Sequence, residues 1–201
     1  MRQPIDYQAI LEYYLKRSQE VVLRFEAPNV LKTDLFNEAM GYPIPGGIAA
    51  NIEAKSVIGV EIDPEVTEKA RQNYHDYYNQ FKVSYRDGDI RALKQKDQEF
   101  DVILDLSTLD HVWPEEVGQV ISEYNRVLKQ NGEILLIVWV DTENNHIEHT
   151  FGKYQQKMIG ENQLKSEITK YFTIEEERVI FTVHSRPNQS LKEFTLKKHE
   201  N

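Results

Sequence analysis

Apolar residues occur in short blocks along this chain, and polar or helix-forming segments separate the blocks. Blocks of this length, with alternating or continuous apolar positions, are typical of β-strands. The two most apolar blocks suit strands that are buried on both faces of a parallel sheet. Only a short Arg-Pro-Asn turn separates the last two blocks, which predicts an antiparallel hairpin. The expected strands are 30–31, 57–60, 81–85, 100–106, 133–140, 172–184 and 190–198.

Helix signals lie between these blocks. Asp6 can cap a helix that runs to about Phe25 and covers one edge of the sheet, and its tyrosines leave open a second role as a lid over a ligand site. Asp63 and Pro64 start another helix, since proline at the first helical position loses no hydrogen bond. The polar stretch 141–149 is expected to be a surface loop. The expected helices are 6–25, a segment after the Gly/Pro loop 41–47, 64–78, a short segment ending at Leu93, 114–128 and 151–171.

Strands that alternate with helices and end in a hairpin predict an α/β fold with a doubly wound, mostly parallel sheet. The chain has 201 residues, which is enough for one well-packed domain. We expect a single domain, 1–201, made of an N-terminal helical cap (1–27), a cofactor-binding core (28–140) and a C-terminal part with loop, helix and hairpin (141–201).

The segment 30–63 reads as strand, loop, helix, strand and acid, which is the outline of a βαβ unit. Such a unit binds a nucleotide-like ligand where its strands end. Glu61 ends the second strand, where an acid accepts hydrogen bonds from ribose hydroxyls. The alternative for Glu61 is a solvated strand end.

Composition narrows the possible partners. The formal net charge is −9, so we do not expect electrostatic binding to nucleic acid or to an anionic membrane. The chain has no cysteine, which excludes disulfides and thiolate chemistry and fits a reducing, cytoplasmic location. No apolar segment suits a signal peptide or a membrane span. His146 and His149 lie near Asp141 and Glu143 without a closing third ligand, so we expect no metal site.

Several short motifs occur in an order and spacing that resemble the class I S-adenosylmethionine-dependent methyltransferase family. The resemblance covers 30–140 and implies a Rossmann-like, seven-stranded sheet whose last strand runs antiparallel. The motifs are Lys32-Thr-Asp34, Val60-Glu-Ile-Asp-Pro64, Gly88-Asp-Ile90, Phe100-Asp-Val102 with Ser107-Thr-Leu-Asp-His111, and Val127-Leu-Lys-Gln-Asn-Gly132.

The resemblance implies an adenosine-binding role for four residues. Glu61 matches the acid that binds both ribose hydroxyls, and Ile62 matches the neighbour that packs on adenine. Asp89 matches the acid that accepts from the adenine amine, with Ile90 beside it. The alternative for Asp89 is a simple turn-forming role after Asp87.

Residues after the fourth strand resemble the methyl-transfer side of the family's site. Ser107 and Thr108 match positions that line the methionine half of the cofactor. Asp110 and His111 fall on the substrate side, where they would position or deprotonate the acceptor as the catalytic pair. Asp110 could instead cap the helix that starts at Pro114.

The sequence departs from the family at the first loop. The usual Gly-rich turn is replaced by a Lys-Thr-Asp-Leu-Phe run, as in a variant branch that the chain resembles more closely. In that form Thr33, Asp34 or Glu38 meets the amino and carboxylate groups of the cofactor, and Lys32 pairs with the carboxylate. The alternative for Lys32 and Asp34 is an internal ion pair.

The function expected from this resemblance is methyl transfer from S-adenosyl-L-methionine to a small molecule. One alternative is a catalytically silent cofactor-binding or interaction domain of the same fold. Another is a nicotinamide-dependent oxidoreductase, which should carry a Gly-x-Gly-x-x-Gly motif that this sequence lacks. The acceptor and the oligomeric state are left open by the sequence.

Overall fold

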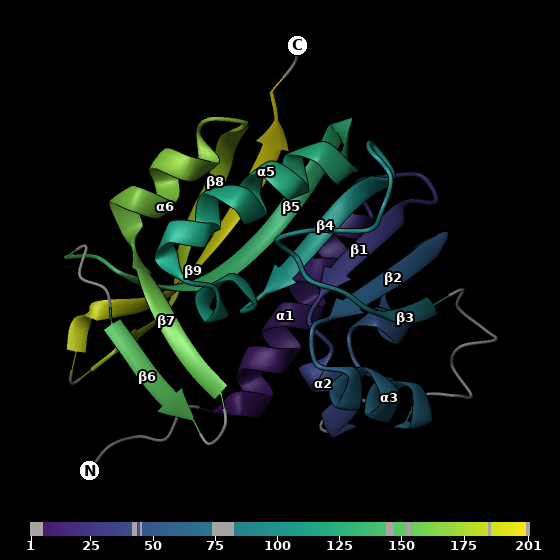
Figure 1. The fold of residues 1–201 in the computed structure, drawn as a ribbon, viewed down its shortest axis with the longest axis horizontal. Coiled ribbons are helices and arrows are strands. Elements are labelled where there is room, and N and C mark those ends of the chain that lie inside the picture. The colour runs from purple at the N-terminus through teal and green to yellow at the C-terminus, as the bar shows by residue number, and fades with distance from the viewer. Residues whose placement is uncertain are drawn as a thin grey trace.

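The computed structural model describes residues 6–41, 44, 46–73, 83–143, 147–151, 154–184 and 186–199, which form an α/β fold (Figure 1). In this part of the chain, no helix has both the length and the apolar character that a membrane span requires. The helices are α1 (Tyr7–Val22), α2 (Phe36–Met40), α3 (Pro64–Asn73), α5 (Val117–Val127) and α6 (Glu161–Ile168). The strands are β1 (Asn29–Thr33), β2 (Ser56–Glu61), β3 (Val83–Asp87), β4 (Phe100–Leu106), β5 (Leu128–Asp141), β6 (Ile147–Phe151), β7 (Tyr154–Gly160), β8 (Phe172–Val183) and β9 (Arg186–Lys198).

The central sheet is mostly parallel, as the sequence predicts. Its first strands lie in the order β3-β2-β1-β4-β5, and each pairs in parallel with its neighbour. β9 then pairs with β5 in the antiparallel direction, and β8 pairs antiparallel with β9. The predicted C-terminal hairpin is therefore confirmed, and β9 is the strand that reverses direction within the sheet.

The segment between β5 and α6 differs from the prediction. A helix was expected over 151–171, with a surface loop over 141–149 before it, but β6 and β7 form an antiparallel hairpin there. Of the described residues in 151–171, Glu161–Ile168 are the helical ones. β7 pairs with the end of β5 through Val140 and Ile159, and Met158 and Ile159 are buried. A short apolar run cannot distinguish a strand from a helix by itself, and this tertiary pairing decides the outcome.

Two smaller helix predictions are also wrong. The segment ending at Leu93 contains an isolated bridge between Asp89 and Ala92 instead of a short helix. After the Gly/Pro loop there is only a 3₁₀ turn, Ala49–Asn51, because the helical turn α2 precedes that loop. The helix expected over 64–78 is described as far as Asn73, and the rest of that range lies outside the described residues.

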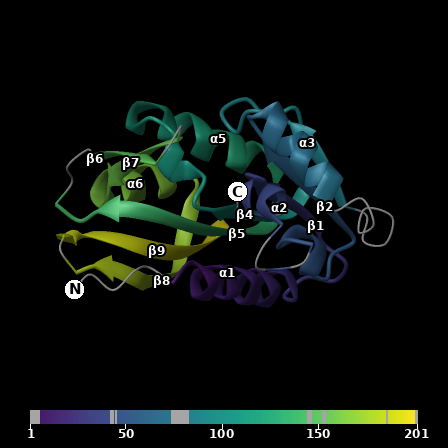
Figure 2. The same ribbon diagram turned by 90° about the horizontal axis from the view of Figure 1, so that it is seen from below.

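Alternate side chains of the central strands enter two separate cores, one on each face of the sheet. On β4, Ile103 joins the core that contains α5 and α6, whereas Val102 and Leu104 join the core that contains α1. Figure 2 shows α1 on one side of the sheet and α5 on the other. The strand period of two thus explains why β4 is apolar along most of its length.

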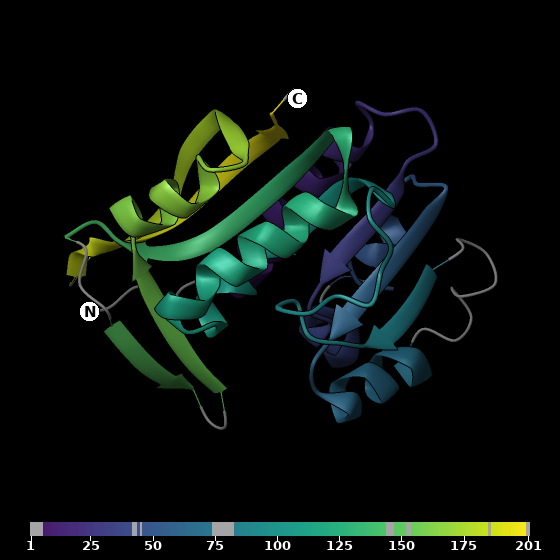
Figure 3. The same cartoon turned by 45° about the horizontal axis from the view of Figure 1, so that its top comes forward.

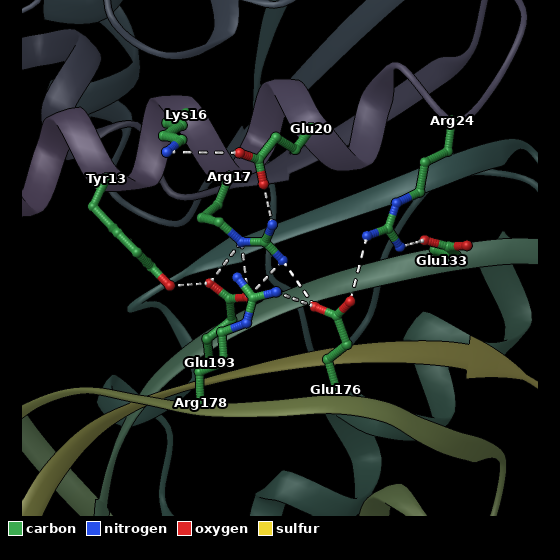
Figure 4. A network of polar contacts seen from close by, with 9 residues as sticks. All are labelled: Tyr13, Lys16, Arg17, Glu20, Arg24, Glu133, Glu176, Arg178 and Glu193. Atoms are coloured by element: carbon green, nitrogen blue, oxygen red, sulfur yellow. Dashed lines mark hydrogen bonds and ion pairs between the residues drawn. The ribbon is translucent and has the colours of Figure 1, made fainter.

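Helix α1 is fixed to the sheet by buried charges as well as by apolar contacts. Asp6 caps it by accepting from the Ala9 amide, as predicted. Arg17 donates to the fully buried Glu193 of β9 at 2.9 Å, and the Tyr13 hydroxyl donates to the same carboxylate at 2.7 Å. Figure 4 shows that Arg17 also contacts Glu176 of β8, so α1 bridges both late strands.

Candidate active site

The carboxyl ends of four neighbouring strands meet at one edge of the sheet (Figures 1 and 3). Thr33 at the end of β1 lies opposite Val60 of β2 and Asp105 of β4. Glu61 at the end of β2 lies opposite Asp87 of β3. In open α/β sheets, ligands bind in the crevice outside this edge.

A cavity of about 240 Å³ lies at this edge, between the β2–β3 side and the segment that follows β4. Seven of the predicted site residues line it, whereas the other five are not among its described lining residues. The lining residues are Asp34, Glu61, Ile62, Asp89, Ile90, Thr108 and His111. The other five are Lys32, Thr33, Glu38, Ser107 and Asp110.

The backbone orients the Glu61 carboxylate. Its Oε2 accepts from the Leu35 amide at 3.0 Å and its Oε1 accepts from the Asp63 amide at 3.0 Å. A carboxylate has about four lone-pair sites, so each oxygen can still accept from a ligand hydroxyl. Ile62 beside it is 62% exposed, which leaves an apolar surface available to a flat ring.

Asp89 is already paired with a cation. Arg91 Nη2 donates to its Oδ2 at 2.7 Å, and the Arg91 amide donates to Oδ1 at 2.9 Å. These bonds from Arg91 lower the pKa of Asp89, so this carboxyl is ionised. Arg91 also contacts Glu116 at 2.8 Å. Arg91 was not among the predicted site residues, although its position two residues after Asp89 was a usable signal.

Asp34 is the acid of the first loop that faces the cavity. It has a positive φ of 65°, and its Oδ1 accepts from the Phe36 amide at 2.8 Å. Burial raises the pKa of Asp34 to about 7; Lys32 opposes this shift, and the nearby Glu38 and Glu61 carboxylates add to it. Its charge state therefore changes near neutral pH.

Lys32 and Glu38 form a buried ion pair behind Asp34. Lys32 Nζ donates to Glu38 Oε2 at 3.0 Å and to the Asp34 carbonyl oxygen at 2.7 Å, and both side chains are fully buried. Burial alone lowers the pKa of Lys32, but Asp34 and Glu38 outweigh it and raise this pKa. Glu38 also accepts from the Ala49 amide at 3.1 Å. A Cβ at Gly47 would lie 2.7 Å from Glu38 Cγ, so glycine is needed there for close packing.

Hydroxyl groups join the first loop to the segment after β4. Thr33 Oγ1 and Thr108 Oγ1 share a hydrogen bond of 2.8 Å, and Thr108 Oγ1 donates to the Thr33 carbonyl at 3.2 Å. Ser107 has a positive φ of 66°, and its hydroxyl shares a 2.8 Å hydrogen bond with Tyr14 of α1. Thr108 thus faces the cavity while Ser107 faces the N-terminal helix.

Asp105 near the end of β4 holds this segment in place. Its fully buried carboxylate accepts from the Thr108 amide at 2.9 Å, the Leu109 amide at 3.2 Å and the Tyr124 hydroxyl at 2.8 Å. Burial raises the pKa of Asp105 to about 6, and these three donors limit the rise. An acid inside an apolar strand was the signal that could have identified it.

Asp110 and His111 differ in their access to the cavity. Asp110 is fully buried, and its Oδ2 accepts from Gln156 of β7 at 2.5 Å. Among the described residues, its Oδ1 has no hydrogen-bond partner. Burial raises the pKa of Asp110, while His111 and Gln156 oppose the rise. His111 lines the cavity directly. Gln156 was not predicted as a site residue, because the apolar pattern around it predicted a helix.

No group of three His, Asp or Glu side chains that could hold a metal ion occurs among the residues the structure describes. His146, considered above for such a site, lies outside the described residues, and so does the side chain of His149. Asp141 is instead engaged by Asn188, whose Nδ2 donates to it at 2.6 Å.

Comparisons with known proteins agree with this architecture. A family described as a methyltransferase domain matches residues 45–132, the stretch that contains most of the cavity-lining residues. A Mycolicibacterium smegmatis protein described as a probable S-adenosylmethionine-dependent methyltransferase is 27% identical over 125 residues, 62% of this chain. The match spans 45% of that relative, so this chain corresponds to about half of its length.

Solved structures share the fold at low sequence identity. The N-methyltransferase NodS from Bradyrhizobium japonicum, in complex with S-adenosylhomocysteine, is 13% identical with a TM-score of 0.68, covering 98% of this chain and 91% of NodS. The cyclase SpnF is also 13% identical, with a TM-score of 0.72, covering 94% of this chain and 81% of SpnF. Residues 45–132 thus match a methyltransferase-domain family, and the described chain shares the fold of these solved structures.

Proposed function

We propose that this protein transfers a methyl group from S-adenosyl-L-methionine to a small molecule. The observation that carries the proposal is one cavity lined by Glu61 from the end of β2, by Asp89 from after β3 and by Asp34 from after β1. Three acids around one cavity suit a ligand that combines ribose hydroxyls, an amine and a sulfonium cation.

We assign the cofactor contacts by position along the cavity. Glu61 accepts from the ribose hydroxyls, Ile62 and Ile90 flank the adenine, and Asp89 accepts from its amine. Asp34 binds the ammonium group of the methionine end. Lys32, Thr33, Glu38 and Ser107 act through these residues, because their own polar atoms bond to the protein.

Methyl transfer requires the donor and acceptor to be held in line at near-contact distance. The methyl carbon of a sulfonium is already electrophilic, so a base is needed only where the acceptor carries a proton. His111 faces the cavity and takes that role, while the buried Asp110 positions the segment through Gln156. Thr108 lines the same side.

A fold alone does not establish methyl transfer, since a cyclase shares it. The first test is a thermal-unfolding panel with S-adenosylhomocysteine and NAD. A specific ligand at a concentration of 100 times its dissociation constant raises the free energy of unfolding by about 2.7 kcal/mol. Stabilisation by S-adenosylhomocysteine alone supports the proposal, and stabilisation by NAD alone contradicts it. If S-adenosylhomocysteine binds but the protein methylates no compound in a pool of metabolites, the protein is a catalytically silent domain.

Variants then separate binding from chemistry. Glu61→Gln should weaken S-adenosylhomocysteine binding about tenfold, because a charged acceptor is lost. His111→Ala should leave that affinity unchanged and slow methyl transfer about 100-fold. The exposed His184 provides a matched control, and His184→Ala should change neither quantity. Equal loss of affinity in both site variants would overturn this division of roles.

We further propose a cytoplasmic protein without a nucleic-acid partner. The absence of cysteine and the net charge of −9 support both parts. Fractionation of the cell and a nucleic-acid binding assay at low salt would test them.

A further inference from the structure

Lys157 of β7 lines the cavity on the side that carries Thr108 and His111. Its Nζ lies 3.6 Å from the centroid of the Trp113 ring. A cation over an indole face is attracted by the ring, so this contact holds the ammonium in place. In the described part of the chain, Lys157 Nζ makes neither a hydrogen bond nor an ion pair. Its three N–H donors are therefore available to water or to a ligand.

The neighbouring charges make Lys157 different from the other cation of the cavity. Arg91 is bound by Asp89 at 2.7 Å and by Glu116 at 2.8 Å, so two carboxylates offset its charge. Glu61 is held by backbone amides and does not compensate Lys157. Of the lysine and arginine side chains that line the cavity, Lys157 is the one without an ion pair to a described carboxylate, so its charge can attract an anionic ligand.

The strand that carries Lys157 is anchored next to it. Gln156 is buried and donates to Asp110 at 2.5 Å, which ties β7 to the segment after β4. Successive side chains of a strand point to opposite faces. Gln156 therefore fixes the strand while Lys157 is presented on its other face. The β6–β7 hairpin, which the sequence did not predict, positions this amine.

We propose that Lys157 binds an acid group, a carboxylate or a phosphate, on the methyl acceptor. This inference rests on the methyltransferase function proposed above. Trp113 is 39% exposed and adds an apolar surface beside the charge, so the acceptor is a small acid with an apolar or aromatic body. The carboxylate of the cofactor is the other source of the same chemistry, and the experiment separates the two.

Trp113 itself can report binding. The chain has two tryptophans, and Trp139→Phe leaves Trp113 as the single indole. The probes are matched pairs, 4-hydroxybenzoate with 4-hydroxybenzamide and phenyl phosphate with phenol, titrated with and without saturating S-adenosylhomocysteine. We expect each acid to bind about tenfold more tightly than its neutral partner, since a charged hydrogen bond is gained.

Three substitutions test whether the Lys157 ammonium causes this preference for acids. Lys157→Gln should abolish it. Lys129→Gln should retain it, because Lys129 pairs with Asp101 at 2.8 Å near the opposite, amino end of β4. Glu148 lies opposite Lys157 in the hairpin register, and Glu148→Gln should also keep the preference. Equal loss in Glu148→Gln and Lys157→Gln would assign the effect to hairpin folding and overturn the inference.

The remaining outcomes distinguish this inference from the proposed function. Equal affinity for acids and neutral partners in the parent protein overturns the inference, even where S-adenosylhomocysteine binds. A loss of affinity for S-adenosylhomocysteine but not for 5′-methylthioadenosine in Lys157→Gln assigns Lys157 to the cofactor carboxylate and also overturns it. Acid preference without any S-adenosylhomocysteine binding overturns the proposed function and leaves the acid site standing.

Discussion

Asp34 illustrates at the residue scale how burial and neighbouring charges set chemistry in this site. Burial raises the pKa of its carboxyl to about 7, the Lys32 ammonium opposes this shift, and the Glu38 and Glu61 carboxylates add to it. A cationic ligand group would favour the ionised form and so bind better where Asp34 is deprotonated.

Cofactor affinity should therefore depend on pH through Asp34. Between pH 6 and pH 8, S-adenosylhomocysteine should bind up to about tenfold more tightly, because the ionised fraction of a group with a pKa of about 7 rises by that factor. Titration calorimetry at several pH values measures this slope. Asp34→Asn should show a flat profile, and an unchanged slope in this variant would remove Asp34 from the ammonium site.

The motifs and the family resemblance pointed to twelve site residues, and seven of these line the cavity. They could not show that Arg91 pairs with Asp89, because that contact depends on the backbone path of the turn. They also could not distinguish Ser107 from Thr108, since the positive φ of Ser107 directs its hydroxyl to Tyr14.

At the scale of the element, the segment after β4 is organised by Asp105. The carboxyl of Asp105 binds its proton more tightly in the folded protein than in the unfolded chain, since burial raises its pKa from 3.8 to about 6. The protonated Asp105 carboxyl therefore contributes to the free energy of unfolding below about pH 4, and this contribution is lost as pH rises through about 6. At 1.36 kcal/mol per pKa unit, the change amounts to about 3 kcal/mol.

The variant Asp105→Asn tests whether Asp105 destabilises the fold as pH rises. The amide oxygen can still accept from the Thr108 amide, but the variant carries no charge at high pH. Relative to the parent protein, its free energy of unfolding should rise by about 2.5 kcal/mol between pH 4 and pH 7. Urea unfolding across this range measures the difference. A difference that is constant with pH would mean that Asp105 does not titrate in this window.

The hairpin β6–β7 shows why element type was missed in one place. Its apolar residues Met158 and Ile159 are compatible with either helix or strand, and pairing of Ile159 with Val140 makes the strand favourable. The predictions of strands at β4 and β5 were correct, because apolar runs of this kind are typical of strands buried on both faces of a parallel sheet.

At the scale of the whole molecule, α1 is part of the fold rather than a separate cover. Its apolar side chains complete one of the two cores, and Arg17 joins it to Glu193. Removing α1 would expose that core, so truncation is a poor test of the predicted lid role. Point substitutions on α1 are a better test, because they can weaken its contacts with the sheet without removing its apolar side chains from the core.

Arg17→Met should destabilise the protein by about 3 to 5 kcal/mol, because it leaves the fully buried Glu193 carboxylate without its main cation. The adjacent Lys16 is the control, since it forms an exposed contact of 4.0 Å with Glu20. Lys16→Met should cost less than about 0.5 kcal/mol. Denaturant unfolding compares the two, and equal effects would show that the buried pair does not hold α1.

The sequence by itself determined the parallel sheet, the antiparallel end and the edge where acids gather, because these depend on periodicity and on the order of elements. Only the tertiary structure decided which side chains face the cavity and which bond to the protein. Such contacts join residues far apart in the chain, as in Asp110 with Gln156 and Arg17 with Glu193. Their geometry depends on packing between elements, and no local pattern encodes it.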